Sequence, residues 1–364
     1  MNPRLWKWII LTVTPIVITF VFSLIIPKES VKEIQPVIDK ITKFNPESFI
    51  AKSPTIESIF DDDNKWIATL SAEKIKTIIF TGDVIPARSV NAKTVRTNDF
   101  NWPYLKTFKK TRDADLTVAN LESPLIQDCP ITDEGMVFCG ASENVQGLVF
   151  AGIDIVSIAN NHFANYGEEG IRKTVDLLTK NNINTVGLDT ILVREIKDTK
   201  FGFLAYNDIE KNQAGINNVD EEKIKKDIKN AKKISDLVII IFHWGEEYRD
   251  LPDDRQKTLA HFAVDNGADL IIGNHPHWIQ PLEIYKNKII VYAHGNFVFD
   301  QMWSLKTRQG IIGKYTFYEN KLIDIKFLPV QIEDYGQPYF LEGDKGLEIL
   351  KTLKEKSIIL SKNE

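Results

Sequence analysis

Five apolar runs in this sequence end in residue types that bind metal ions. The residues are Asp83 after IIFTG, Glu122 after LTVANL, Asn161 and His162 after IVSIAN, His243 after LVIIIF, and His275 and His277 after DLIIGN. Short runs rich in isoleucine and valine are typical of buried strands. Open α/β sheets place their ligand sites beyond the carboxyl ends of the strands. We therefore predict an α/β fold in which these side chains converge.

The order of elements along the chain supports this fold class. Amphipathic stretches separate the apolar runs, and they predict helices over Glu168 to Lys180, Asp220 to Ile234, and Asp253 to Asn266. The later runs, at 287–299, 310–320 and 321–331, follow one another closely, as antiparallel strands do. The sheet should therefore be mixed. Residues 342–364 predict a closing helix with a frayed end.

The N-terminal region predicts a membrane anchor. Residues 8–26 (WIILTVTPIVITFVFSLII) carry no charge and follow Arg4 and Lys7, and about 20 apolar residues span a bilayer. No cleavage site of small residues follows, so we expect the segment to be retained. Residues 28–74 mix proline with charged residues, which predicts a stalk. The expected layout is an anchor over 1–27, a stalk over 28–74 and an extracytoplasmic domain over 75–341.

Composition limits the partners and the compartment. The formal net charge is −5, with no isolated block of lysine and arginine, which argues against nucleic-acid binding and leaves a small or polymeric ligand. Cys129 and Cys139 are ten residues apart in a turn-rich stretch and are the two cysteines of the chain. They predict a disulfide in an oxidising compartment, the alternative being two unrelated thiols.

The candidate ligands form a set of oxygen and nitrogen donors without a thiolate. Such a set suits Zn, Mn or Fe and does not suit copper(I) or an iron–sulfur cluster. Six ligands indicate two divalent ions, bridged by Asp83 or Glu122 and a hydroxide. A pair of ions of this kind clamps a phosphoryl oxygen and activates the nucleophile. The cluster therefore predicts metal-dependent hydrolysis.

Six blocks of the sequence resemble, in the same order, those of the CapA-type capsule (poly-γ-glutamate) synthesis proteins, a branch of the calcineurin-like metallophosphatases. The blocks are TGDVIPARSV, ANLESPL, SIANNHFANYG, IFHWGEEY, GNHPHWIQPLE and GNFVFDQ, and the resemblance covers residues 76 to about 330. NNH or GNHPH alone would be a weak motif, but the whole series in this order is specific. The resemblance implies a metallophosphatase-like sandwich of two mixed β-sheets flanked by helices.

The resemblance also implies roles for individual residues. The metal-binding positions match Asp83, Glu122, Asn161, His243, His275 and His277. His162 matches the histidine that protonates the leaving group, a task that suits imidazole at neutral pH. Arg88, Glu247 and Asn296 are candidate substrate contacts. Trp244, Glu246 and Tyr248 are expected on the rim of the site.

The chain departs from the family pattern at two places. Asn165 replaces a carboxylate that orients or charges the catalytic histidine, which puts acid catalysis by His162 in doubt. His294 stands beside the expected site without an assigned role.

Simpler interpretations exist for several of these residues. His243 could cap a buried strand, Asp83 could start a turn, and Arg88 could be a solvated charge. Pro276 favours an extended chain that turns His275 and His277 to the same side. We expect packing or surface roles for His261, and packing roles for Phe297 and Phe299.

Two functions from different classes follow. The first is an anchored hydrolase that cuts a phosphoester or another bond of a surface polymer, with His162 as the acid. The second is a component that binds an anionic polymer without cutting it, in a complex with synthase subunits in the cell membrane. A purely structural metal site is disfavoured, because such sites are closed and tetrahedral.

Overall fold

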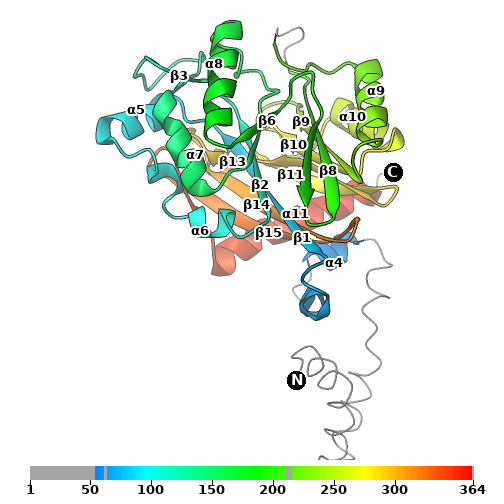
Figure 1. Cartoon of the computed structure of the whole chain (residues 1–364). Coiled ribbons are helices and arrows are strands. Elements are labelled where there is room, and N and C mark those ends of the chain that lie inside the picture. The colour runs from blue at the N-terminus through cyan, green and yellow to red at the C-terminus, as the bar shows by residue number, and fades with distance from the viewer. Residues whose placement is uncertain (1–53, 61–63, 210–214, 363–364) are drawn as a thin grey trace, which may run out of the picture. The chain divides into compact units, whose positions relative to one another are not determined.

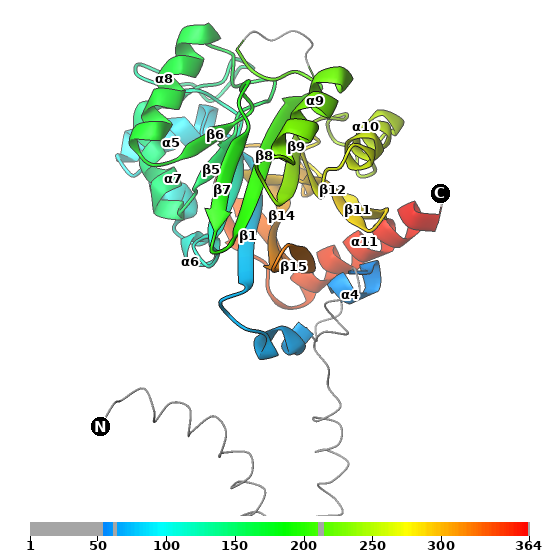
Figure 2. The ribbon, with the colours of Figure 1, turned by 45° about the vertical axis from the view of Figure 1, so that its right-hand side comes forward.

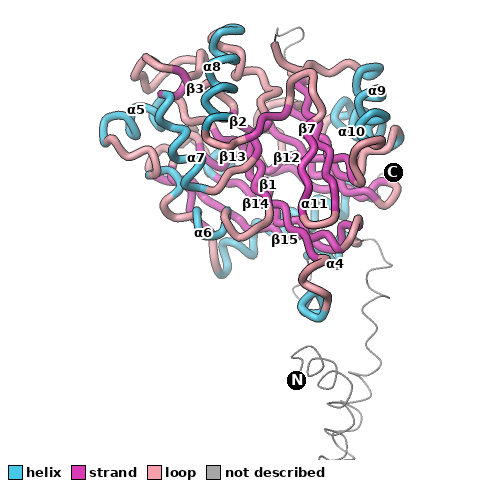
Figure 3. The backbone as a smooth tube through the Cα atoms, in the orientation of Figure 1, coloured by secondary structure: helices cyan, strands magenta, loops and turns pink. Residues whose placement is uncertain are grey.

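The computed structural model of the chain describes residues 54–60, 64–209 and 215–362. The predicted anchor and the first part of the predicted stalk lie outside these ranges. Within them, no helix has the length and apolar character needed to cross a bilayer. The elements are shown in Figures 1 and 2 and, by type, in Figure 3.

The first sheet is built around the N-terminal strand of the domain. Its order is β16-β15-β14-β1-β2-β5-β6, and β13 also pairs with β1. Strands β1, β2, β5 and β6 are parallel, whereas β14, β15 and β16 run antiparallel to their neighbours. The bounds are β1 (Ile75–Val84), β2 (Leu116–Leu121), β5 (Ile155–Ser157), β6 (Asn184–Val186), β13 (Asn296–Val298), β14 (Gln309–Tyr318), β15 (Lys321–Glu333) and β16 (Gln337–Phe340).

The second sheet is also mixed. Its order is β11-β12-β10-β9-β8-β7, with parallel pairing from β8 to β12 and antiparallel pairing at both edges. The bounds are β7 (Leu192–Ile196), β8 (Thr199–Asn207), β9 (Leu237–His243), β10 (Leu270–Asn274), β11 (Ile279–Tyr285) and β12 (Lys288–His294). A separate short pair joins β3 (Leu125–Ile126) to β4 (Gly140–Ala141). The prediction of mixed pairing is confirmed.

The two sheets pack face to face over a shared core. Ile239 and Ile241 of β9 belong to the same hydrophobic cluster as Ile78 and Phe80 of β1. Alternate strand residues point to opposite faces, so the intervening Ile240 lies in a different cluster, on the outer side of its sheet. Burial on both faces explains why these strands read as continuous apolar runs rather than as alternating patterns.

Helices cover the outer face of each sheet (Figures 1 and 2). On the first sheet these are α5 (Arg88–Thr97), α7 (Val145–Ala151) and α8 (Gly167–Lys180). On the second they are α9 (Glu221–Ala231) and α10 (Asp254–Asp265), and a capping box of Asp253 and Gln256 starts α10. The expected sandwich of two mixed sheets flanked by helices is therefore confirmed. Shorter elements are η1 (Asn64–Thr69), η2 (Trp102–Tyr104), α6 (Phe108–Thr111), η3 (Ser142–Asn144) and η4 (Lys306–Arg308).

The C-terminal helix and a short N-terminal helix pack on the same part of the body. The closing helix α11 (Gly343–Lys362) lies against β11 and β15, and Leu353 is buried in the core between the sheets. Helix α4 (Ile56–Phe60) adds Ile56 and Ile59 to that core. The compact domain therefore includes residues that precede Ile75, in a segment where the sequence predicts only a stalk.

Candidate metal centre

Strand pairing brings the predicted ligands to one region. Asp83 lies in register with Asn120 of β2, and His243 of β9 lies in register with Asn274 of β10. The carboxyl ends of neighbouring parallel strands lie at the same edge of a sheet. His243 then connects the two sheets, since its Nε2 is 3.4 Å from Glu122 Oε1. The predicted convergence of strand ends is observed.

A close backbone crossing sets the position of Asp83. The backbone N–H of Asp83 donates to the carbonyl of Gly295 at 2.9 Å. A Cβ on the preceding Gly82 would lie 2.0 Å from that same carbonyl oxygen, so no larger residue fits without displacing the chain. Gly82 thus allows the ligand-bearing end of β1 to approach the loop before β13.

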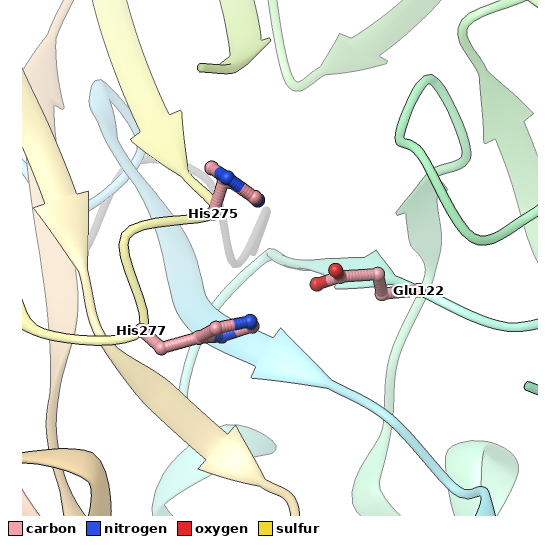
Figure 4. A group of neighbouring side chains, drawn as sticks. All are labelled: Glu122, His275 and His277. Carbon is pink, nitrogen blue, oxygen red and sulfur yellow. The ribbon is translucent and has the colours of Figure 1, made fainter. Parts of the chain in front are cut away.

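The predicted ligands form two overlapping groups. Glu122, His275 and His277 offer ligand atoms within 4.8 Å of one another, and so do Asp83, Glu122 and His243. Figure 4 shows the first group, with both imidazoles directed toward the Glu122 carboxylate. Glu122 belongs to both groups and is fully buried. It is therefore the carboxylate that both groups share, and it is one of the two residues that the sequence suggested as a bridge.

Asn161 completes the predicted set. Its Oδ1 lies 2.8 Å from His243 Nε2, and that nitrogen lies 3.4 Å from Glu122 Oε1. Ligand atoms that each lie about 2.0–2.2 Å from one ion are about 3 Å apart. The two distances from His243 Nε2 match that spacing.

The residues present fit a divalent cation. Asp83 Oδ2, Glu122 Oε1 and His275 Nδ1 are buried and poorly satisfied among the described residues. Asp83 Oδ2 has only a long contact of 3.3 Å with His277 Nδ1, and Glu122 Oε1 has one of 3.4 Å with His243 Nε2. Buried polar atoms of native proteins nearly always have a close partner. A bound divalent cation would satisfy all three atoms, because each is a common metal ligand.

Burial sets the protonation of the imidazoles. It lowers the pKa of His243 to about 3 and holds the pKa of His275 well below its usual range, so both are neutral at pH 7. Neutral imidazole is the form that binds metal ions. Burial also lowers the pKa of His277, but the hydrogen bond to Asp83 and the charge of Glu122 outweigh it and raise the value to about 9.

The two carboxylates respond in opposite directions. Burial and the nearby charge of Asp83 raise the pKa of Glu122 well above its ordinary value. Burial opposes ionisation of Asp83 as well, but the hydrogen bond and charge of His277 lower its pKa. Two buried carboxylates at this separation require a positive charge, which the protonated His277 supplies here and a cation would supply more fully.

Asn120 is a functional residue that the sequence analysis missed. Its Nδ2 lies 2.8 Å from Asp83 Oδ1, 3.3 Å from Glu122 Oε2 and 3.3 Å from His243 Nδ1. Its Oδ1 accepts a hydrogen bond from Asn160 at 3.1 Å. The sequence did offer one signal for this role: an asparagine stands within the apolar run, two residues before Glu122 and therefore on the same side of the strand.

The loop after β10 differs from the extended geometry expected around Pro276. His275 has φ 97° and His277 has φ 58°, both outside the extended region. The loop is held by the backbone N–H of Tyr248, which donates to the Pro276 carbonyl at 2.8 Å. The two histidines still face one cluster, but a strained turn rather than strand alternation places them there.

Asn296 fixes the orientation of His277. Its Oδ1 lies 2.8 Å from His277 Nδ1, while its Nδ2 donates to the Thr307 carbonyl at 2.9 Å. The amide oxygen therefore faces Nδ1, which donates to it and also lies 3.3 Å from Asp83 Oδ2. Asn296 is fully buried and does not line the cavity described below, so its position indicates a positioning role rather than the expected substrate contact.

His162 lies beside the cluster and is held by two groups. Its ring stacks on Phe138 at a centroid distance of 4.0 Å, and its Nδ1 lies 3.1 Å from Asn165 Oδ1. The departure at Asn165 therefore preserves the orientation of the ring, although an amide adds no charge.

A cavity of about 380 Å³ opens beside the cluster; of the predicted ligands, His277 lines it, together with other charged and aromatic residues. The lining residues include Arg88, Phe138, His162, Glu247, Tyr248, His277 and Phe299. Glu247 and Tyr248 are thus on the rim as expected, but Trp244 is fully buried and donates through Nε1 to the Tyr292 carbonyl. Glu246 bonds to Arg249 and does not line the cavity.

Arg88 lines this cavity but already has a partner. It pairs with Asp300 and lies over the rings of Phe138 and Phe299. Its contact with an anion remains a prediction. Phe299 thus contributes to the cavity wall as well as to packing, whereas Phe297 is a core residue as expected.

The cysteines are joined as the sequence predicted. Cys129 and Cys139 form a disulfide, with Cα atoms 5.9 Å apart. The closed loop contributes Asp133, Met136 and the adjacent Phe138 to the cavity wall. The disulfide therefore restrains the segment that packs on His162.

Two further histidines lie outside the ligand groups. His261 bonds to the buried Glu283 at 2.6 Å and stacks on Tyr285, in agreement with the expected packing or surface role. His294 is fully buried, with Nε2 3.2 Å from the Tyr315 hydroxyl.

Comparisons with known proteins agree with the blocks identified in the sequence. The family model described as "Bacterial capsule synthesis protein PGA_cap" matches residues 77–301. The PGA biosynthesis protein CapA of Bacillus subtilis (strain 168) is 29% identical over 319 residues, which cover 81% of each chain. The capsule biosynthesis protein CapA of Bacillus anthracis is 29% identical over 285 residues, which cover 72% of this chain and 68% of the relative. A crystal structure of a novel phosphatase from Mycoplasma pneumoniae has a TM-score of 0.48 at 16% identity, covering 75% of this chain and 96% of that one.

Proposed function

Because the chain belongs to the bacterial capsule synthesis protein family, we propose that it is a metal-dependent hydrolase of capsule polymer biosynthesis. The bond it cuts is a phosphoester or another bond of an anionic surface polymer. The observation that carries this proposal is the pair of ligand groups that share Glu122, next to a cavity lined by His162.

The ligand set favours two divalent ions, which can be Mn, Zn or Fe. Glu122 is grouped with Asp83 and His243 and, separately, with His275 and His277. Asn161 Oδ1 lies 2.8 Å from His243 Nε2, in the first of these groups. Two ions bound there would polarise the substrate and activate a water molecule for attack.

The protein's own residues supply positioning and proton transfer. Asn120 holds three ligands, and Asn296 holds His277. His162 carries a proton on Nδ1 toward Asn165, so Nε2 is the atom that protonates the leaving group. Phe138 and Phe299 exclude water from one wall of the cavity, and Arg88 and Glu247 are positioned to select the substrate.

We also propose that the domain works outside the cytoplasm, anchored through residues 8–26 and associated with synthase subunits in the membrane. The disulfide supports an oxidising compartment, because such bonds persist outside the cytoplasm. The chain has a net negative charge, which repels an anionic substrate. Cations bound at the cluster would overcome this repulsion, so the proposal depends on the metal centre.

A second function is favoured by one specific observation. Asn165 offers His162 a neutral amide instead of a carboxylate, and a carboxylate is what normally stabilises the protonated ring. The domain could then bind an anionic polymer at the metal cluster and pass it to its partners without hydrolysis.

Turnover by matched histidine variants separates the two functions. The full-length chain is assayed on a phosphodiester and a phosphomonoester with added manganese or zinc, next to His162→Gln and His261→Gln. His261 lies outside the ligand groups and serves as the control. Hydrolysis by the wild type and by His261→Gln, but about 10²-fold less by His162→Gln with metals retained, supports the hydrolase. Metal binding without any turnover supports the binding component.

A further inference from the structure

A second cavity, larger than the first, lies on the other side of the ligand-bearing loop. Its volume is about 560 Å³, and it runs between helix α11 and the segments that precede β11 and β14. Figure 2 shows α11 beside β11 and β15. None of the predicted site residues lines it. It is therefore distinct from the cavity at His162.

The two cavities are separated by short segments of chain. His277 lines the first cavity, and the next residue, Trp278, lines the second. In the same way Trp303 lines the first and Leu305 the second. The ring of Tyr248, in the first cavity, is 6.2 Å from the ring of Trp278. A ligand longer than one cavity could therefore pass from one to the other over these side chains.

Positive charge dominates the walls of the second cavity. Four cationic side chains line it against two acidic ones, and the cations are Lys306, Arg308, Lys345 and Lys356. Lys306 and Lys356 both bond to Asp250, at 3.1 and 2.8 Å, so that carboxylate is already neutralised. The pKa of Asp250 is lowered by these hydrogen bonds and charges, chiefly the hydrogen bond of Lys356, which keeps it ionised and paired. Arg308 and Lys345 remain to bind an anion.

Two buried donors in this wall have no partner. The Nε of Arg308 and the Nε1 of Trp278 are buried without a hydrogen bond to any described residue. Both atoms are closed off from solvent, so an acceptor in the cavity would pair with the accessible part of the half-buried Arg308 side chain rather than with these N–H groups. A carboxylate suits a guanidinium, because both are planar and can form paired hydrogen bonds.

The floor of the cavity is apolar. Ile279, Leu305, Ile349 and Leu353 contribute to it, and Lys306 lies over the Trp278 ring at 4.2 Å. Such a surface suits methylene groups between charged groups. The combination indicates a flexible chain that alternates aliphatic segments with carboxylates.

We propose that this second cavity is an anion-binding subsite for a carboxylate-bearing segment of an acidic polymer whose neighbouring segment lies at the metal cluster. This inference rests on the proposed function for the polymer at the metal cluster, but its charge and donor pattern stand independently. The ligand-bearing loop is also tied to the subsite directly, because Asn296 joins His277 to the carbonyl of Thr307, between Lys306 and Arg308.

The test measures binding of a γ-linked glutamate hexamer and of the matched glutamine hexamer to the full-length chain by calorimetry. Arg308→Gln and Lys345→Gln each remove one charge from the cavity. Lys351→Gln removes the same charge from a position of α11 that does not line the cavity and serves as the control. Circular dichroism of each variant verifies folding. Lys345 is exposed, so its replacement tests the subsite even if Arg308→Gln does not fold.

We expect Arg308→Gln to weaken binding of the glutamate hexamer by about tenfold, because one charge-assisted hydrogen bond is lost. Lys345→Gln should weaken it by about threefold, and Lys351→Gln should leave it unchanged. Added salt should weaken binding to the wild type, and the glutamine hexamer should bind poorly. Equal affinity of the wild type and both cavity variants, or equal affinity for the two hexamers, would overturn the proposal.

Two readouts separate this subsite from the proposed function. Hydrolysis of a small phosphodiester should be the same in the wild type and Lys345→Gln, because that substrate does not reach the second cavity. If no variant and no wild-type sample hydrolyses it while the affinity pattern is present, the hydrolase proposal fails and the subsite stands. If hydrolysis is present without the affinity pattern, the subsite fails alone.

Discussion

The Oδ1 of Asn165 accepts two hydrogen bonds, one from the backbone N–H of Phe138 at 2.7 Å and one from His162 Nδ1 at 3.1 Å. The backbone N–H can only donate, so the atom that faces both groups is the amide oxygen. Nδ1 of His162 must then carry a hydrogen, and Nε2 is the nitrogen that exchanges a proton with the substrate. An asparagine thus fixes the tautomer that a carboxylate would fix, without its charge.

Replacing Asn165 separates orientation from charge. Asn165→Asp adds a negative charge beside the imidazole and favours its protonated form, so activity should persist to higher pH than in the wild type. Asn165→Ala removes the acceptor and should lower kcat by about tenfold through loss of orientation. The measurement is the pH profile of kcat for the three proteins. Identical profiles for the wild type and Asn165→Asp would show that His162 does not act as the acid.

Removing the disulfide should affect both stability and activity. Cys129→Ser together with Cys139→Ser opens a loop of about ten residues, which should lower the free energy of unfolding by about 2–3 kcal/mol. The loop also carries Phe138, whose ring stacks on His162, so kcat should fall while metal content is retained. Urea unfolding and elemental analysis measure the two effects. Unchanged kcat in the double variant would mean that Phe138 stays in place without the disulfide.

Asn120 should control metal affinity without binding the metal. Its amide lies within hydrogen-bond distance of Asp83, Glu122 and His243, and partners of this kind typically change affinity by about 10–100-fold. Asn120→Ala should therefore bind manganese or zinc that much more weakly in a calorimetric titration. Asn266→Ala is the control. The Asn266 side chain donates to the Phe262 carbonyl at the end of α10 and forms none of the hydrogen bonds to the three ligands. Equal affinity in the two variants would contradict the role assigned to Asn120.

Asp324 should make the folded state less stable as pH rises. Burial raises the pKa of Asp324 to about 6, above its ordinary value of 3.8. Between these values the unfolded chain has released a proton that the folded chain retains, so the free energy of unfolding falls as pH rises through the window and then levels off. Asp324→Asn should therefore gain stability relative to the wild type, by about 2 kcal/mol at pH 7 and near zero at pH 3.5.

Urea unfolding of both proteins at the two pH values tests this expectation. A constant difference between them would show that Asp324 is not the titrating group. The position is distant from the ligand groups in sequence and bonds to Asn64, so activity provides an internal check and should not change.

The sequence predicted which residues form the site, but it did not predict the local backbone geometry of the site. Ligand residues at the ends of apolar runs could be identified because buried strands leave a strong signal and parallel pairing aligns their ends. The backbone of His275 and His277 could not be predicted, because positive φ angles there depend on the contact between Pro276 and Tyr248, a residue 28 positions earlier. The proline favoured an extended chain, and tertiary contact prevailed.

Packing also explains the other differences. Trp244 follows a ligand and was expected at the rim, but strand alternation turns it to the outer face of its sheet, under α9 and α10. Helix α4 gave no signal as part of the domain, because five residues with two buried isoleucines are too short for a periodic pattern. The second cavity depends on α11, whose docking the sequence does not indicate.

The most direct test of the account is the metal content of the full-length chain compared with Glu122→Gln. Glu122 belongs to both ligand groups, and the substitution keeps the size of the side chain while removing its charge. The account predicts close to two divalent ions per chain in the wild type and a loss of both in the variant, by elemental analysis after dialysis. A wild type without bound metal, or a variant that retains two ions, would contradict it.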